Sequence, residues 1–141
     1  MTADPAPQHV PPAETILFVE DEALVRMDLA QYLRECGYPV HEAANANEAM
    51  EALQSKFAID VVFTDIKLPG EMNGLDLADW TLANRPGVKV IVTTGDPART
   101  ELPDAVGSIL AKPYTGRDLL GRVQQALRTR SQSVNQPVSS E

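Results

Sequence analysis

The stretch Ala58–Gly70, which reads AIDVVFTDIKLPG, decides the fold. Its run of β-branched and aromatic residues predicts a strand that is buried on both faces. The strand ends on Asp65, and a Pro-Gly turn follows soon after. A carboxylate at the end of a buried strand lies where an open α/β sheet binds its ligands. An isolated aspartate is more often a turn or capping residue, so the other strands have to decide between the two interpretations.

On both sides of this strand, apolar strands and amphipathic helices alternate along the chain. The expected strands are residues 15–19, 38–43, 58–65, 88–94 and 106–111. This alternation predicts an α/β protein with a flavodoxin-like, doubly wound, five-stranded parallel sheet and helices on both faces. Because Pro39 suits only an edge strand, whereas the first strand is fully apolar, we expect the strand order 2-1-3-4-5.

Apolar residues at helical spacing predict the buried face of each helix. The expected faces are Val25, Leu29, Leu33 and Cys36 in the first helix; Ala46, Ala49, Met50, Leu53 and Phe57 in the second, capped by Asn45 or Asn47; Leu75, Ala78 and Leu82 in the third, which begins at Gly74; and Leu119, Leu120, Val123 and Leu127 in the last, over residues 115–129. Cys36 is thus interpreted as a small buried apolar residue, while His41 is expected at the surface. Asp96 and Pro97 predict a short fourth helix.

Length and charge limit the possible functions. The 141 residues fit one domain, expected over residues 15–129, with a disordered leader over 1–14 and a flexible tail over 130–141. The net charge of −8 argues against nucleic acid or an anionic membrane as the main partner. No apolar run or secretory signal predicts membrane insertion or export, so a cytoplasmic location is expected.

Four of the expected strands end on residues that suit phosphoryl chemistry. Glu20 and Asp21 follow the first strand, Asp65 ends the third, Thr94 ends the fourth and Lys112 follows the fifth. Each alone has an ordinary explanation as a cap, a strand end or a solvated charge. Parallel strands, however, bring all of these side chains to one edge of the sheet.

Three carboxylates gathered at one edge repel one another and raise each other's pKa. A Mg²⁺ ion, which favours a few oxygen ligands together with water and phosphate oxygens, would relieve that repulsion. A carboxylate beside the ion can attack phosphorus and form an aspartyl phosphate. Lys112 and Thr94 would then stabilise the charge on the transferring group.

Four motifs together resemble the receiver domain of two-component response regulators. They are VEDE at 19–22, TDIKLP at 64–69, VTTG at 92–95 and AKPY at 111–114, and the resemblance covers about residues 15–128. It implies that Asp65 is the phosphoacceptor, that Thr94 is the switch hydroxyl and that Lys112 pairs with the phosphoryl group. It also implies a cis peptide bond between Lys112 and Pro113.

The same resemblance implies a metal site. Asp21, Asp65 and the backbone carbonyl of Lys67 are expected to bind Mg²⁺, and Glu20 is expected to hold the ion through water. The chain departs from the family at Ile109, where an aromatic residue is frequent, and in a loop after Asp65 that is one residue longer. Lys67 and Asp96 are hypothesised to pair over the site and to restrict the attacking water.

The expected function is that of a stand-alone receiver. It would take a phosphoryl group from a sensor histidine kinase or a phosphotransfer protein, catalyse only its own phosphorylation and dephosphorylation, and change its contacts with an unidentified downstream protein. It would be a monomer or a phosphorylation-dependent dimer. One alternative is a phosphatase of the haloacid dehalogenase type, but those usually carry a second aspartate where this chain has Lys67. The other alternative is a binding module that does not use phosphorylation.

Overall fold

The computed structural model describes residues 14–95 and 108–135 of the chain. In chain order the elements are β1 (Ile16–Val19), α2 (Ala23–Glu35), β2 (Val40–Ala43), α3 (Ala46–Gln54), β3 (Val61–Asp65), α4 (Gly74–Asn84), β4 (Lys89–Thr94), β5 (Ser108–Ala111) and α5 (Gly116–Asn135). Residues 1–13 of the predicted leader, and the fourth helix predicted from Asp96 and Pro97, lie outside the described residues.

The strands form one parallel sheet in the order β2-β1-β3-β4-β5, as predicted. All residues of β1 and β3 are buried, because helices cover both faces of these inner strands. The register places Asp65 beside Thr93 at the end of β3, and Thr94 beside Ala111 at the end of β4. The carboxyl ends of the inner strands therefore meet at one edge of the sheet.

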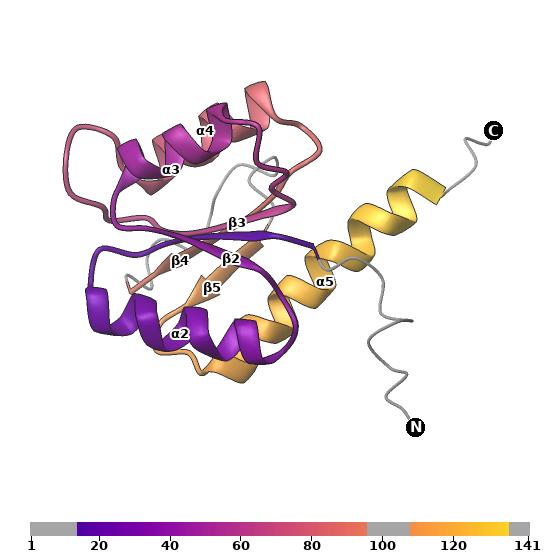
Figure 1. Cartoon of the computed structure of the whole chain (residues 1–141), viewed down its shortest axis with the longest axis horizontal. Helices are drawn as coiled ribbons and strands as arrows, with labels where there is room; N and C mark the ends of the chain where they lie inside the picture. Colours follow the sequence, from indigo (N-terminus) through magenta and orange to yellow (C-terminus); the bar gives the residue numbers. More distant parts are fainter. Residues whose placement is uncertain (1–13, 96–107, 136–141) are drawn as a thin grey trace.

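Helices α3 and α4 lie on one face of the sheet, and α2 and α5 lie on the other (Figure 1). Alternate residues of β1 supply the two cores: Leu17 belongs to the core under α3 and α4, and Phe18 to the core under α2 and α5. Phe18 stacks on Phe63 of β3, with ring centroids 4.9 Å apart. Each fully buried side chain of this size contributes about 1.5–3 kcal/mol, so the two cores fix the sheet that carries the strand ends.

Side-chain caps fix where α3 and α4 begin. Asn45 accepts a hydrogen bond from the backbone of Glu48, which selects Asn45 over Asn47 as the cap of α3. Asn73 caps α4 in a reciprocal arrangement with Asp76. The loop after β3 therefore ends at a defined residue, and α4 begins next to the site.

Four sequence predictions about the helices were wrong. Val25, expected on the buried face of α2, is 37% exposed, because it lies in the first turn of the helix and lines a surface cavity. Cys36 is exposed, because α2 ends at Glu35 and Cys36, as its C-cap residue, no longer continues the buried face. Phe57 is 53% exposed, because α3 already ends at Gln54, and its ring lies 4.8 Å from that of His41. Helix α5 continues to Asn135 instead of ending at residue 129, because no proline or glycine interrupts residues 130–135.

Candidate functional site

The carboxyl edge of the sheet brings together four of the residues that the sequence singled out. Asp65 and Thr94 are the last residues of β3 and β4, and both are buried. Glu20 directly follows β1 and is 3% exposed, while Lys112 directly follows β5. The extended strands end here because polar or turn-forming residues follow their apolar runs. The site is thus a product of the parallel topology, as expected.

The carboxylate of Asp65 is held from two sides. Its Oδ2 accepts a hydrogen bond from Lys112 Nζ at 2.6 Å, and its Oδ1 accepts one from the backbone N–H of Lys67 at 3.1 Å. The side chain of Asp65 is only 9% exposed. A charge-assisted hydrogen bond in such a place is short and strong, so the ammonium fixes the orientation of the carboxylate.

The pKa of Lys112 follows from the same contact. Burial favours the neutral amine, but the hydrogen bond to Asp65 and the negative charges of Asp65 and Glu20 together raise the pKa of Lys112 above its ordinary value. Lys112 therefore stays an ammonium and supplies a fixed positive charge at this edge of the sheet.

The pKa of Glu20 is raised in its buried position beside other acidic groups. Burial raises the pKa of Glu20, and repulsion by Asp65 and Asp21 acts in the same direction. The backbone N–H of Glu22, which donates to Glu20 Oε2 at 3.0 Å, and the charge of Lys112 oppose the shift without cancelling it. The repulsion that the sequence analysis anticipated is therefore present between these carboxylates.

The oxygen donors at this edge fit a hard divalent cation. Glu20 and Asp65 are buried, whereas Asp21 is exposed. Across residues 14–95 and 108–135, no three His, Cys, Asp or Glu side chains already form a group that could hold a metal ion. Mg²⁺ is usually bound by one or two carboxylates while it keeps several waters, so this donor set suits it. Its charge would also offset the burial and the repulsion that together raise the pKa of Glu20.

Gly74 is a site residue whose role the sequence analysis missed. A Cβ atom on Gly74 would lie 2.0 Å from the carbonyl oxygen of Asp65, and the N–H of Gly74 donates to the carbonyl of Ile66 at 2.8 Å. The start of α4 therefore packs directly against the backbone that carries the Asp65 carboxylate. The available signal was a glycine, a poor helix former, at the first position after a capping asparagine.

A cavity of about 520 Å³ lies next to the acidic residues. Its lining includes Glu20, Val25, Leu29, Lys112, Pro113 and Tyr114. The ring of Tyr114 meets that of Phe63 edge-on, with centroids 5.8 Å apart. Burial raises the pKa of Tyr114, and the charges of Glu20 and Asp65 add to this effect. The phenol therefore stays neutral and gives the cavity an uncharged wall beside the ion pair.

The fold and this edge together define a doubly wound α/β protein in which a buried aspartate pairs with a more exposed lysine at the carboxyl ends of the strands. The Lys112–Pro113 peptide bond is cis, as the resemblance implied. Residues 16–124 match the response regulator receiver domain, and the chain belongs to this family. The resemblance to receiver domains is thereby confirmed. The family is a signalling domain of two-component systems and not an enzyme in the ordinary sense.

Known relatives differ in how much of their length the chain covers. The chain is 36% identical over 118 residues to the sensor kinase CckA of Brucella abortus. This match covers 80% of the chain but only 12% of CckA. It is 33% identical over 116 residues to the response regulator receiver protein CpdR of the same organism, covering 79% of the chain and 95% of CpdR. The chain spans between 12% and 56% of the length of the first curated relatives that it matches.

A solved structure of a response regulator has the same fold. The response regulator TrrA of Thermotoga maritima superimposes with a TM-score of 0.72 at 30% identity, covering 80% of this chain and 98% of that one, and it was solved in complex with Mg²⁺ and a beryllium fluoride. Within the described part of this chain, no helix has the length and apolar character that crossing a membrane requires.

Proposed function

We propose that this chain accepts a phosphoryl group on Asp65 and uses the aspartyl phosphate to change its contacts with other proteins. The observation that carries the proposal is the 2.6 Å contact between Lys112 Nζ and Asp65 Oδ2, in a buried position of a chain from the receiver family. Phosphoryl transfer needs a nucleophile and a fixed positive charge within reach of the same group. This pair supplies both.

The proposed donor is a phosphohistidine on a sensor histidine kinase or on a phosphotransfer protein. A carboxylate oxygen of Asp65 forms the new bond to phosphorus while the bond from phosphorus to the histidine nitrogen breaks, and the electron pair of that bond returns to the imidazole. Lys112 exchanges its contact with the carboxylate for one with the phosphoryl oxygens. Thr94, buried at the end of β4, is the proposed hydroxyl partner of the phosphoryl group.

Glu20, Asp21, Asp65 and the backbone carbonyl of Lys67 are the residues that would hold Mg²⁺ here, Glu20 through a water molecule. When bound, the ion would neutralise charge on the phosphoryl oxygens. The complex of TrrA with Mg²⁺ and a beryllium fluoride supports this assignment by similarity. The raised pKa of Glu20, caused first by burial and then by repulsion from Asp65 and Asp21, is consistent with this assignment, because a nearby cation would favour the charged carboxylate.

The surface next to the site supports a protein donor over a small molecule. Leu24 is 82% exposed, Met27 is 55% exposed and Val25 is 37% exposed, all on the first turns of α2. Val25 also lines the cavity that Lys112 borders. Large exposed apolar side chains beside a reactive group are typical of a protein-binding surface. We therefore place the phosphodonor protein against this end of α2.

The two alternatives have less support. A haloacid dehalogenase phosphatase usually carries a second aspartate two residues after the nucleophile, and Lys67 occupies that position with an exposed side chain. A binding module without phosphorylation is less favoured because every residue expected of a phosphoacceptor site is present in the chain. The pairing of Lys67 with Asp96 stays a prediction, since Asp96 lies outside the described residues, and Lys67→Ala is expected to speed dephosphorylation.

The test is incubation with Mg²⁺ and acetyl phosphate, followed by intact mass spectrometry. We expect the wild-type protein to gain one phosphoryl group and Asp65→Asn to gain none. Asp60→Asn is a matched control, because Asp60 precedes the same strand but accepts its hydrogen bond from Thr15, far along the strand from the site. Modification of Asp65→Asn, or steady turnover of a phosphate ester by the wild type, would contradict the proposal. A wild-type protein that acetyl phosphate and beryllofluoride both leave unchanged would favour the binding module.

A further inference from the structure

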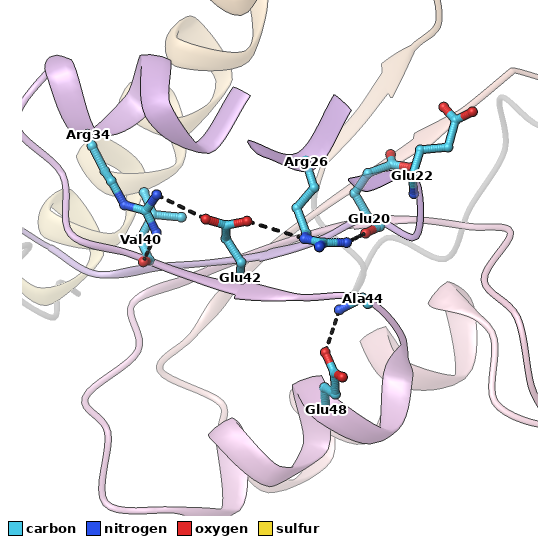
Figure 2. A network of polar contacts seen from close by, with 8 residues as sticks. All are labelled: Glu20, Glu22, Arg26, Arg34, Val40, Glu42, Ala44 and Glu48. Carbon is cyan, nitrogen blue, oxygen red and sulfur yellow. Dashed lines mark hydrogen bonds and ion pairs between the residues drawn. The ribbon is translucent and has the colours of Figure 1, made fainter. Parts of the chain in front are cut away.

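Arg26, on the second turn of α2, links the acidic site to the edge of the sheet. Its Nη1 donates to the backbone carbonyl of Glu20 at 2.9 Å, and its Nε donates to Glu42 Oε1 at 3.2 Å. Figure 2 shows the guanidinium of Arg26 between these two residues, with the carboxylate of Glu42 on the side away from the site. The Arg26 side chain is 18% exposed.

The carbonyl of Glu20 belongs to the peptide bond that joins Glu20 to Asp21. That carbonyl and the N–H of Asp21 belong to one planar peptide unit, so a hydrogen bond to the carbonyl sets the orientation of the whole unit. The backbone of Glu20 is also held on its other side, where its N–H donates to the carbonyl of Ala43 at 3.0 Å. Together the two contacts determine the direction in which the chain delivers Asp21, the exposed carboxylate of the proposed metal set.

Glu42 in turn holds Arg26. Its other oxygen, Oε2, accepts a hydrogen bond from Arg34 Nη1 at 2.9 Å, so one half-buried carboxylate bridges two arginines of α2. Arg34 also donates from Nη2 to the carbonyl of Val40 at 2.8 Å. Each arginine thus makes one ion pair with Glu42 and one hydrogen bond to a backbone carbonyl, and the two differ in which carbonyl they hold.

We propose that Arg26 is a positioning residue, which orients the Glu20–Asp21 peptide so that its carboxylates can bind a divalent cation. The inference rests on the proposed function, because it concerns the metal site of that same edge. Residues that orient metal ligands without touching the metal themselves typically strengthen metal binding about 10- to 100-fold. Since Arg26 acts on the backbone and not on a ligand atom, we expect the lower end of that range.

The test is a calorimetric titration with Mg²⁺ of the full chain, comparing Arg26→Met with Arg34→Met. Both variants lose one ion pair with Glu42 and one hydrogen bond to a carbonyl, so a merely structural role predicts similar effects. We expect Arg26→Met to raise the Kd for Mg²⁺ about tenfold and Arg34→Met to leave it unchanged. Thermal unfolding without Mg²⁺ measures the stability that each variant loses, and we expect that loss not to track the Kd.

Equal Mg²⁺ affinities of Arg26→Met and the wild type would overturn the inference, as would an equal weakening in Arg34→Met. If Arg26→Met does not fold, Arg26→Lys and Arg34→Lys give the same comparison, because lysine cannot hold a carbonyl and Glu42 in the same fork. Weaker Mg²⁺ binding in Arg26→Lys alone supports the inference, and equal binding of the two lysine variants rejects it. A wild-type protein that binds no Mg²⁺ would instead refute the proposed metal site, and this inference with it.

Discussion

Replacing Gly74 with alanine is expected to destabilise the protein and to disturb the proposed phosphoacceptor. The new Cβ atom would lie 2.0 Å from the carbonyl oxygen of Asp65, where ordinary contacts begin at 3.4 Å. The overlap of 1.4 Å (3.4 − 2.0) can be relieved only by moving α4 or the end of β3, since the clashing atoms belong to the backbone. Overpacking of this kind costs about 1–3 kcal/mol.

Alanine forms helices better than glycine, so helix propensity alone predicts that a Gly→Ala substitution stabilises a helix. A loss of stability in Gly74→Ala would therefore come from the close packing at this position. Gly121 is a matched control in α5, because a Cβ there would meet no atom within 4 Å. We expect Gly121→Ala to stabilise the protein by about 0.5–1 kcal/mol. Gly74→Ala should instead lose about 2 kcal/mol, the middle of the overpacking range, which corresponds to a fall in Tm of roughly 6 °C for a domain of this size.

Urea unfolding can be followed through Trp80, the only tryptophan of the chain, which lies on α4 and packs against the core. Phosphorylation by acetyl phosphate gives the second measurement, and we expect Gly74→Ala to be modified more slowly than Gly121→Ala. If both alanine variants were more stable than the wild type, or if Gly74→Ala were phosphorylated at the wild-type rate, the reasoning from the close approach would be refuted.

Three further predictions concern charges and caps. Lys112→Met should slow phosphorylation by acetyl phosphate about 100-fold. It should also lower the free energy of unfolding by about 1–3 kcal/mol, because the Asp65 carboxylate, which is only 9% exposed, loses a hydrogen-bond donor; normal phosphorylation of this variant would contradict the assignment. The raised pKa of Glu20 means that the folded state holds a proton that the unfolded state releases, so stability falls as the pH rises from 4.5, the ordinary value, through the raised one. In urea unfolding without Mg²⁺, Glu20→Gln should therefore exceed the wild type in stability at pH 7, and the gap should close below pH 4.5; a gap that does not depend on pH would argue against burial as its cause. Asn73→Ala and Asn45→Ala should each lose about 1 kcal/mol in urea unfolding, and no loss in either would exclude the caps observed here.

The sequence was sufficient for the strand order and for the residues at the strand ends, since both follow from local patterns. A run such as Val61–Asp65 fixes a buried strand and its last residue without reference to the rest of the chain. Pro39, directly before β2, and the alternation of strand and helix then leave few topologies. The contact between Lys112 and Asp65 follows once parallel strands end at the same edge.

Contacts between segments far apart in the sequence were decided only by the tertiary structure. The approach of Gly74 to the Asp65 backbone depends on how closely α4 packs, and the bond from Arg26 to Glu42 depends on which side chains of α2 face β2. The exposure of Cys36 has the same origin, because helical spacing indicates a face but not where the helix ends. The local periodicity of the sequence indicates which face of a helix or strand is buried. The distances between segments far apart in the sequence are set by the packing of the whole domain.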